Sequence, residues 1–308
     1  MGNPTLQYSN TPIPSLALRS RLLHATRCFF HERGFLEVET PVRLKTPALE
    51  THIDAEPSGD HWLRTSPELH MKRLLAAGHE RLFQLGPCFR RGERGDRHHP
   101  EYTMLEWYRA HADYTDILAD AEALMGCLVA SLSDQSDPSV TYQGRRIALL
   151  PRWPRITVRA AFLQWAGWDP VAAWDEERFN LDLVEKVEPA LPRDVPVVLT
   201  DYPAPAAALA RRKPDQPEVA ERWELYVGGL ELANAYSELT DPVEQRARFE
   251  EAARQRRALG KAVYPLDEEF LAALPRMPPS GGIALGFDRL VMLFADAPTL
   301  DDVIAFRE

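Results

Sequence analysis

Side chains that suit the binding of a polyphosphate are concentrated in residues 81–109. Alternation of apolar and polar residues predicts two strands joined by a loop, with Arg90 at the end of the first strand facing a cleft. In the second strand Tyr102, Glu106 and Tyr108 share that face. The loop contains five basic residues, which are Arg91, Arg94, Arg97, His98 and His99. Because guanidinium groups bind phosphate oxygens in bidentate fashion, the stretch predicts an ATP-binding hairpin; a solvated basic hairpin and a nucleic-acid contact are the alternatives.

Two carboxylates, Glu231 and Glu238, lie in a second polar stretch within residues 222–239. The surrounding alternation predicts a strand, on which residues seven positions apart face opposite sides. Asn234 and Glu238 share one face, so a site that includes both acids requires a bulge or turn between Gly228 and Asn234. The alternative is that the two acids are isolated and face solvent.

The composition is that of an ordinary globular protein. The chain has 308 residues, of which 45% are apolar, enough for a sizeable core. Its net charge of -10 argues against the binding of a long nucleic acid, which needs a basic face. No segment has the apolar length of a membrane span, and the N-terminus lacks the features of a secretory signal. Cys28, Cys88 and Cys127 are far apart and odd in number, so we expect buried thiols in a reducing cytoplasm.

Hydrophobic periodicity places these stretches among helices and further strands. Ser15 is expected to cap a helix that ends at Gly34, and a strand follows over residues 35–40. Residues 131–190 are expected to form an insertion, with a loop up to residue 154 and two short Trp-containing helices after it. The other predicted elements are helices over residues 69–77, 117–128 and 243–259, a strand over residues 195–202, and a strand followed by a helix over residues 281–294.

Three segments, in this order along the chain, resemble the signature motifs of class II aminoacyl-tRNA synthetases, in the form found in lysyl-tRNA synthetases. Residues 33–41 (RGFLEVETP) are similar to motif 1. Phe89-Arg90, with residues 98–108 (HHPEYTMLEWY) after the loop, is similar to motif 2, and residues 282–290 (GIALGFDRL) are similar to motif 3. The resemblance implies an α+β fold with one antiparallel sheet flanked by helices, in a single domain over residues 1–308. It also implies a homodimer formed through the motif 1 region.

The resemblance further implies an enzyme that activates a carboxylate with ATP and Mg²⁺. In this family the acid attacks the α-phosphorus, pyrophosphate leaves, and catalysis depends on positioning and on neutralising phosphate charge. Arg90 and Arg289 are expected to be the catalytic arginines, the first bridging the carboxylate and the α-phosphate and the second contacting adenine and the γ-phosphate. Glu231 and Glu238 are expected to bind the metal. The other implied ATP contacts are Arg91, Gly92, His98, His99, Tyr102, Leu232 and Gly286.

An amino acid pocket for lysine is also implied. The implied contacts are Ser66 and Glu68 with the nearer amino group, Asn234 with the carboxylate, and Glu238 and Tyr108 with the distal ammonium. A buried ammonium must be paired, so a Glu and a phenol at one end of a pocket suit a lysine side chain. Glu106 is expected either to support these residues or to be an ordinary packed residue.

Three features resemble more narrowly the truncated paralogues of lysyl-tRNA synthetase that ligate (R)-β-lysine to elongation factor P. Only about a dozen residues precede the first predicted helix, so we expect no N-terminal anticodon-binding OB domain. Ala284 stands in the expected pocket wall where lysyl-tRNA synthetases have Gly, and residues 105–109 (LEWYR) have the ending typical of the paralogues. Residues 89–92 (FRRG) depart from the usual Phe-Arg-Asn-Glu, with an acid only at Glu93, and His99 replaces the usual Asn.

The sequence therefore predicts a cytoplasmic ATP-dependent ligase whose protein acceptor is elongation factor P, with no tRNA or membrane partner. One alternative is a compact lysyl-tRNA synthetase that charges tRNA, which the acidic charge and the expected lack of an OB domain oppose. The other is a non-catalytic paralogue that only binds a partner. Loss of Arg90, Arg289 or Glu231 would favour that alternative, and all three are present.

Overall fold

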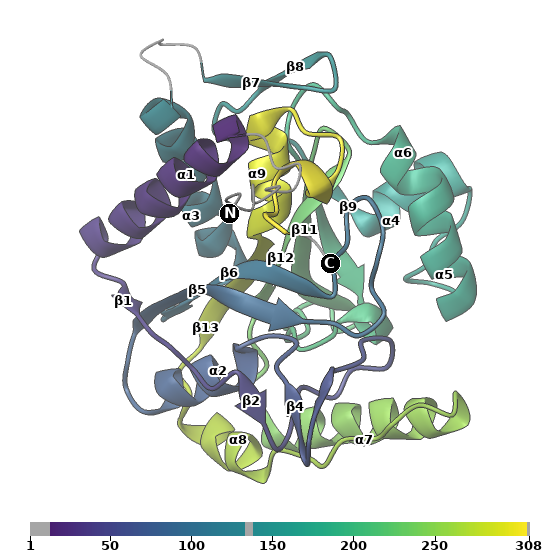
Figure 1. Ribbon diagram of the computed structural model, residues 1–308. Coiled ribbons are helices and arrows are strands. Elements are labelled where there is room, and N and C mark those ends of the chain that lie inside the picture. The colour runs from purple at the N-terminus through teal and green to yellow at the C-terminus, as the bar shows by residue number, and fades with distance from the viewer. Residues whose placement is uncertain (1–12, 133–137, 307–308) are drawn as a thin grey trace, which may run out of the picture.

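The computed structural model describes residues 13–132 and 138–306, which form one mixed sheet with helices against both of its faces (Figure 1). The sheet has eight strands in the order β1-β5-β6-β13-β12-β11-β10-β9. In that order the strands are β1 (Leu36–Glu37), β5 (Arg81–Phe89), β6 (Glu101–Ala110), β13 (Ser280–Gly286), β12 (Leu230–Ser237), β11 (Val219–Val227), β10 (Val197–Pro203) and β9 (Arg155–Thr157). The α+β architecture and the β5–β6 hairpin expected from the sequence are confirmed.

The strands of the sheet are antiparallel in the centre and parallel at the two edges. The six strands from β5 to β10 pair antiparallel, whereas β1 pairs parallel with β5 and β9 pairs parallel with β10. This corrects the expectation of a purely antiparallel sheet. Two parallel strands need a crossover connection, and here each connection contains helix. The chain passes through α2 (Glu68–Ala76) between β1 and β5, and through α4 (Val158–Ala161), α5 (Glu176–Asp182) and α6 (Glu188–Ala190) between β9 and β10.

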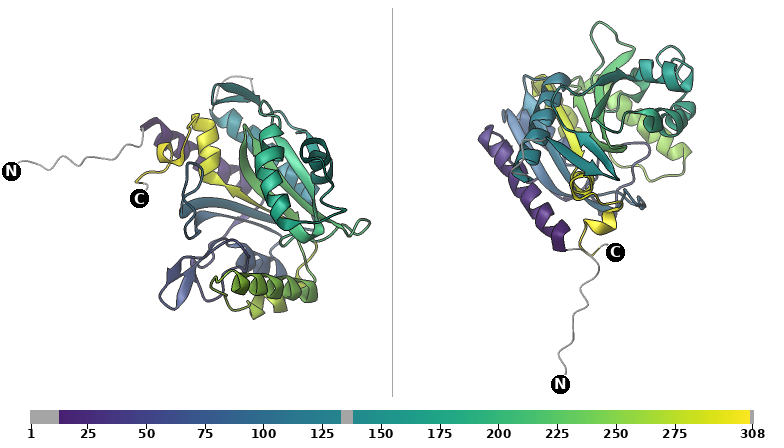
Figure 2. Two further views of the ribbon diagram at one scale, coloured as in Figure 1. Left: turned by 90° about the vertical axis from the view of Figure 1, so that its right-hand side faces the viewer. Right: turned by 90° about the horizontal axis from the view of Figure 1, so that it is seen from above.

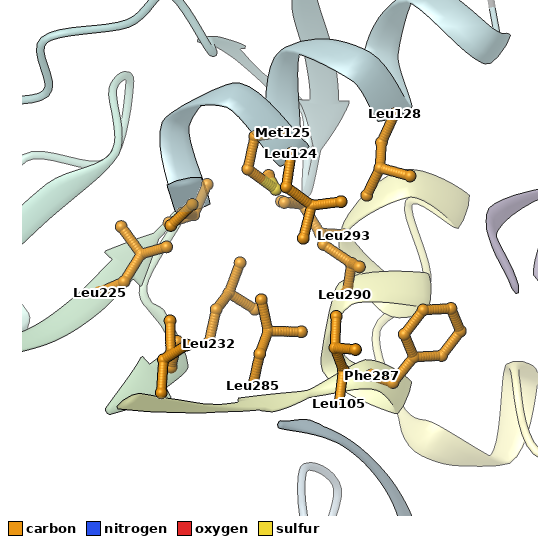
Figure 3. Packing of buried hydrophobic residues seen from close by; sticks show 14 of the residues in the cluster. Leu105, Leu124, Met125, Leu128, Leu225, Leu232, Leu285, Phe287, Leu290 and Leu293 are labelled. Atoms are coloured by element: carbon orange, nitrogen blue, oxygen red, sulfur yellow. The ribbon is translucent and has the colours of Figure 1, made fainter. Parts of the chain in front are cut away.

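One face of the sheet is covered by an apolar core. The helices on this face are α1 (Ile13–Glu32), α3 (Tyr114–Leu132) and α9 (Phe287–Ala295). Figure 3 shows Leu124, Met125 and Leu128 of α3 meeting Leu290 and Leu293 of α9 above leucines of the sheet. Leu105 and Trp107 of β6 are fully buried in this core, as the alternation along the strand predicted. Burying one such side chain contributes about 1.5–3 kcal/mol, so this face needs no polar group to be stable.

Three helices lie against the other face, which carries the polar residues of β6. They are α2, α7 (Pro242–Ala258) and α8 (Glu268–Ala273), and they lie below the sheet in the view of Figure 1. Their apolar side chains form a second cluster with Leu82 and Tyr108 of the hairpin. A three-stranded sheet packs beside them, made of β2 (Arg43–Leu44), β3 (Pro57–Ser58) and β4 (His61–Leu63). The predicted helix over residues 243–259 is confirmed by α7.

Arg19 attaches helix α1 to α9 through an ion pair and to the sheet through a hydrogen bond. Arg19 Nη1 lies 2.6 Å from Asp288 Oδ1, and its Nη2 donates to Thr103 Oγ1 at 2.8 Å. The described part of the helix begins at Ile13, so Ser15 lies in its first turn and is not the predicted cap. Gly34 has a φ of +73° and follows the last turn, which confirms the predicted end of the helix.

The segment over residues 131–190 contains more regular structure than the sequence predicted. Residues 133–137 lie outside the described part, and a hairpin follows, β7 (Ser139–Tyr142) and β8 (Arg145–Ala148). Its two-residue turn at Gln143 and Gly144 has positive φ at both positions, the geometry of a tight hairpin turn. Tyr142 and Ile147 bury themselves against the main core. The prediction of a loop was therefore wrong. It relied on the Ser, Asp and Pro content of the segment and overlooked the short apolar alternation within the two strands.

The two short helices predicted within this segment are confirmed in part: α4 continues into a π-helical turn over Phe162–Ala166, and α5 continues into one over Leu183–Val187, but Trp168 and Trp174 lie outside these helices. Figure 2 shows these helices on one side of the molecule, next to β10. Cys28, Cys88 and Cys127 are free, but only Cys88 is buried, so the expectation of three buried thiols was wrong for the other two. Within the described ranges no helix combines the length and the apolar character needed to cross a membrane.

Candidate active site

A cavity of about 650 Å³ opens on the face of the sheet that carries Glu106 and Tyr108. It is bounded by the β5–β6 hairpin, strands β11 to β13, and the segment that leads into α2. Every site residue expected from the sequence lines it except Arg91. Those that do are Ser66, Glu68, Arg90, Gly92, His98, His99, Tyr102, Tyr108, Glu231, Leu232, Asn234, Glu238, Ala284, Gly286 and Arg289.

Arg90 lies where β5 ends, with its guanidinium over the ring of Tyr102. The distance from Arg90 Cζ to the ring centroid is 5.2 Å, and the Tyr102 hydroxyl donates to the carbonyl oxygen of Thr65 at 2.8 Å. In the part of the chain that the structure describes, the buried Nε of Arg90 has no hydrogen-bond acceptor. A buried donor without a partner is costly, so this arginine is prepared for an anionic ligand.

The loop between β5 and β6 folds over Arg289, at the start of α9. Arg289 Nε donates to the carbonyl oxygen of Arg97 at 3.1 Å, and its Nη2 lies 2.7 Å from His98 Nε2. Burial and the Arg289 charge lower the pKa of His98, so its ring is neutral near pH 7 and can accept this hydrogen bond. Arg289 Nη1 also donates to the carbonyl oxygen of Glu231 at 2.8 Å. These contacts join the second and third sequence motifs at one end of the cavity, hereafter the arginine end (Arg90 and Arg289).

Arg91 does not join this group and, unlike the other residues expected to contact ATP, does not line the cavity. Its side chain is exposed, and its backbone N–H donates to the carbonyl oxygen of Asp54 at 2.7 Å. Glu93, by contrast, lines the cavity, with Oε2 at 3.8 Å from Arg90 Nη1. The altered loop therefore still presents one acid beside Arg90.

The opposite end of the cavity, hereafter the acidic end, contains Glu68, Glu106, Tyr108 and Glu238. Glu106 accepts hydrogen bonds from the Tyr108 hydroxyl at 2.5 Å and from Ser66 Oγ at 2.8 Å. Ser66 Oγ in turn accepts from the backbone N–H of Glu68 at 2.9 Å. Because the phenol donates its proton to Glu106, its oxygen can serve only as an acceptor for a ligand. Glu106 thus supports Ser66 and Tyr108, which was one of the two roles expected for it.

Lys72 pairs with two carboxylates at the acidic end, and the sequence reasoning missed it. Its ammonium lies 2.5 Å from Glu68 Oε1 and 2.5 Å from Glu238 Oε2, and its side chain is 1% exposed. Lys72 follows Glu68 by four positions, a spacing that places two side chains on the same face of a helix. That spacing, in the helix predicted over residues 69–77, could have revealed the pair.

A bulge in β12 brings Glu231 onto the face of the sheet that lines the cavity. Tyr226 pairs with Glu231 and Leu225 pairs with Ala233, so Leu232 is one extra residue in β12. The extra residue reverses the alternation, and Glu231 joins the face of Asn234. The predicted bulge between Gly228 and Asn234 is confirmed.

The bulge does not bring Glu231 and Glu238 together, however. They flank opposite ends of β12, and a rise of about 3.3 Å per residue separates their Cα atoms by roughly 20 Å. One ion cannot contact both, so the expected metal pair was wrong. The carboxylate close to Glu231 is Glu224 of β11. Burial is the larger cause that raises the pKa of Glu231, and the negative charge of Glu224 is the next. Alternation with Arg222 and Tyr226 along β11 could have identified Glu224.

Glu224 is surrounded by hydrogen-bond donors. Its Oε1 accepts from Arg222 Nη2 at 2.6 Å, and its Oε2 accepts from the hydroxyls of Tyr202 and Tyr226 at 2.6 and 2.7 Å. Arg222 Nε also donates to Asn234 Oδ1 at 3.2 Å, which orients the amide expected to contact a carboxylate. No three His, Cys, Asp or Glu side chains of the described ranges converge in a way that would hold a metal ion. Any metal here would need ligands from a substrate, as Mg²⁺ at phosphates ordinarily does.

Strand β13 closes the middle of the cavity. Ala284 is paired with Asn234 of β12 on one side and with Glu106 of β6 on the other, where a pocket wall was expected. Gly282 lies so close to Glu238 Oε1 and the Tyr108 ring that a Cβ atom there would overlap both. A glycine at this position is therefore required by the acidic end.

Comparison with known proteins agrees with this geometry. The family described as tRNA synthetases class II (D, K and N) matches residues 7–308. The chain belongs to this family. Its relatives include the elongation factor P--(R)-beta-lysine ligase of Hamiltonella defensa, 38% identical over 96% of both chains. They also include the lysine--tRNA ligases of Moorella thermoacetica and Dehalococcoides mccartyi, each 38% identical over 94% of this chain.

The chain spans less than two thirds of those lysine--tRNA ligases, 64% and 63% of their lengths. The two kinds of relative are equally similar in identity, so family membership alone does not decide between a protein and a tRNA acceptor. The class II fold accounts for the mixed sheet and for the convergence of the second and third motifs on one cavity.

We predict that Gly282→Ala destabilises the protein by about 1–3 kcal/mol, the usual effect of forcing an extra methyl group into a packed site. The matched control is Gly286→Ala on the same strand, where the nearest atom to a new Cβ is Arg289 Cδ at 3.8 Å, an ordinary van der Waals distance. Thermal unfolding of both variants measures the difference. Equal melting temperatures would contradict the close approach at Gly282.

Proposed function

We propose that this protein is an ATP-dependent ligase that adenylates (R)-β-lysine and transfers it to a lysine side chain of elongation factor P. The observation that carries the proposal is the separation of charge along the cavity. The arginine end suits the phosphates and the substrate carboxylate, and the acidic end suits ammonium groups. A diamino acid has both kinds of group at opposite ends.

The charge at the acidic end supports a substrate with two ammonium groups. Glu68, Glu106 and Glu238 carry three negative charges when ionised, and Lys72 neutralises one of them. The two ammonium groups of a diamino acid would neutralise the other two negative charges. Burying unpaired charge costs several kcal/mol, so a neutral or acidic amino acid would leave this end uncompensated. Lysine and β-lysine carry the same charges; Ala284 and the relative from Hamiltonella defensa favour the second.

In the proposed adenylation the amino acid carboxylate attacks the α-phosphorus of ATP, and pyrophosphate leaves. Arg90, with its unpaired Nε, would bind the reacting carboxylate and the α-phosphate. Arg289, which is held by the carbonyl oxygen of Glu231, would bind the nucleotide. Gly286 and Leu232 lie beside Arg289 and would contact the adenosine. These groups lower the barrier by positioning the reactants and by neutralising charge, without a covalent enzyme intermediate.

Magnesium would bind beside Glu231 and Glu224. Glu231 is half-buried, and three hydrogen bonds leave Glu224 one further acceptor site, so the two suit an ion that takes one or two carboxylates and completes its shell with phosphates and water. The ion would supply positive charge to the phosphates. Glu238 would contact the distal ammonium and no metal.

The second step would pass the acyl group to the acceptor amine and release AMP. Elongation factor P is proposed as acceptor because the relative of that name matches over nearly its whole length. The net charge of -10 also disfavours a nucleic acid. Charging of tRNA with lysine is the second candidate, which the similarity to lysine--tRNA ligases favours.

We also propose a homodimer and a cytoplasmic location. Leu16 of α1 and Leu36 and Val42 beyond it are 40%, 51% and 37% exposed, so the motif 1 region has apolar side chains for a second subunit to cover. The three free thiols suit a reducing compartment.

The proposal predicts ATP–pyrophosphate exchange with (R)-β-lysine, weaker exchange with lysine, and none with the neutral analogue norleucine. Incubation with elongation factor P should then add the mass of one β-lysyl group, and tRNA(Lys) should remain uncharged. Exchange confined to neutral or acidic amino acids would refute the substrate. Efficient tRNA charging without a mass gain on elongation factor P would establish the second candidate.

Glu224→Gln is expected to raise the Mg²⁺ concentration needed for half-maximal exchange by about tenfold or more. The matched control is Glu221→Gln, because Glu221 lies on the same strand and pairs with Arg211 at 2.7 Å but does not line the cavity. An equal Mg²⁺ requirement in both variants would contradict a metal site at Glu224.

Binding of the diamino acid is expected to strengthen as pH rises from 6 to 8. Burial raises the pKa of Glu238 to about 7 and that of Glu106 to about 8, so both are largely protonated at pH 6. An ammonium favours the ionised carboxylates, and binding therefore releases protons. For Glu238 alone, the Kd should fall by about fivefold between pH 6 and pH 7. Calorimetry in two buffers measures the Kd and the protons released. Glu238→Gln should keep only the pH dependence that Glu106 contributes, and a constant Kd in the wild type would contradict the prediction.

A further inference from the structure

Lys72 has a position that neither the proposed chemistry nor the fold requires of a lysine. It lies on α2, one turn after Glu68, and its ammonium is buried at the wall of the acidic end. Glu68 Oε1 and Glu238 Oε2 each lie 2.5 Å from this one nitrogen, so the two oxygens cannot be further apart than twice that distance. A single ammonium thus draws together carboxylates from a helix and from the far end of β12.

Glu238 can still bind a ligand after it has paired with Lys72. Lys72 donates a hydrogen bond to Glu68, and its ammonium also forms a hydrogen-bonded ion pair with Glu238 Oε2 at 2.5 Å. A carboxylate has about four acceptor sites, so Glu238 keeps its charge near Lys72 and can still accept from a second ammonium.

We propose that Lys72 is a specificity-determining positioning residue: its internal ammonium orients Glu68 and Glu238 and favours the charged form of Glu238, so that the acidic end accepts an amino acid with a second ammonium group. This rests on the proposed function in naming the substrate class. Lys72 acts through the two carboxylates and does not itself contact the reacting atoms.

The physical reason is the cost of like charges in a buried place. The titratable groups that face Lys72 are Glu68 on its own helix, Glu106 and Tyr108 on β6, and Glu238 after β12. Without a cation among them, the buried Glu106 and Glu238 would be protonated to a greater extent, which avoids repulsion and the cost of desolvation. A protonated Glu238 is a neutral group, which no longer distinguishes an ammonium from a methyl group.

The simpler role for Lys72 is to fill space with its aliphatic stem. Lys72→Met keeps the stem and removes the charge, and therefore separates the two roles. We expect a KM for the diamino acid raised by about tenfold or more, a KM for ATP that is unchanged, and weaker discrimination against norleucine. The matched control is Lys213→Met, because Lys213 pairs with Asp201 at 2.7 Å away from the cavity and should leave all three values unchanged.

Chemical rescue provides a second readout. Lys72→Ala removes the atoms of n-propylammonium, so this ion should restore part of the exchange activity, whereas n-propanol should not. A wild-type KM and pH profile in Lys72→Met, or equal rescue by the ion and the alcohol, would overturn the proposal in favour of packing alone.

The pH dependence of unfolding tests Lys72 without any substrate. In Lys72→Met the unpaired carboxylates should have folded-state pKa values above their unfolded values, which destabilises the folded state increasingly as pH rises. The melting temperature of Lys72→Met should therefore fall below that of the wild type at pH 8 and approach it at pH 5. A gap that does not change with pH would refute the role of Lys72. Loss of exchange with every amino acid in the wild type, with this gap intact, would refute only the proposed function.

Discussion

Three carboxylates and one ammonium share a place that solvent hardly reaches, and the elements around it are arranged to keep these charges paired. Helix α2 supplies Glu68 and Lys72, β6 supplies Glu106 with Tyr108, and the chain after β12 supplies Glu238. Buried ions are tolerated only when paired and hydrogen-bonded. This requirement explains why β13 has a glycine where it passes Glu238, and why a helix packs across the ends of strands that are distant in the sequence.

The two faces of the sheet have different roles, one in stability and the other in forming the cavity. One face buries leucines and aromatic rings under α1, α3 and α9 and provides most of the stability (Figure 3). The other face is polar and leaves a cavity between the sheet and the chain that leads into α2. Because alternate residues of each strand face opposite sides, every strand of the centre contributes to both. Loss of packing on one face would therefore displace the polar groups on the other.

The arginine end depends on contacts between segments that the sequence separates widely. The loop after β5 lies over Arg289 of α9 through His98 and Arg97, and Arg97 Nη1 donates to the carbonyl oxygen of Gly229 in the β11–β12 turn at 3.0 Å. The second and third motifs thus meet at one end of the cavity, and the bulge at Leu232 directs Glu231 toward them. The distance between this end and the acidic end suits a substrate with opposite charges at its two ends.

Local patterns in the sequence were sufficient to predict the hairpin, the faces of β6 and the bulge in β12. Each of these depends on alternation over a few residues, which the backbone geometry of a strand determines by itself. Most of the expected site residues came instead from the resemblance of three segments to family motifs, and they are only part of the lining, which also includes Glu50, Arg222 and Glu224. The parallel edges of the sheet, the β7–β8 hairpin and the exposure of Arg91 were not predictable in this way, because they depend on which distant segment lies alongside.

The same distinction applies to the charges. The sequence by itself determined which acids and arginines are available and which of them share a strand face. Only the tertiary structure decided that Glu231 is next to Glu224 and far from Glu238, and that the ammonium of Lys72 lies between Glu68 and Glu238. Pairing of buried charges is a matter of distances between elements, and such distances are set by packing across the whole sheet and not by spacing along the chain.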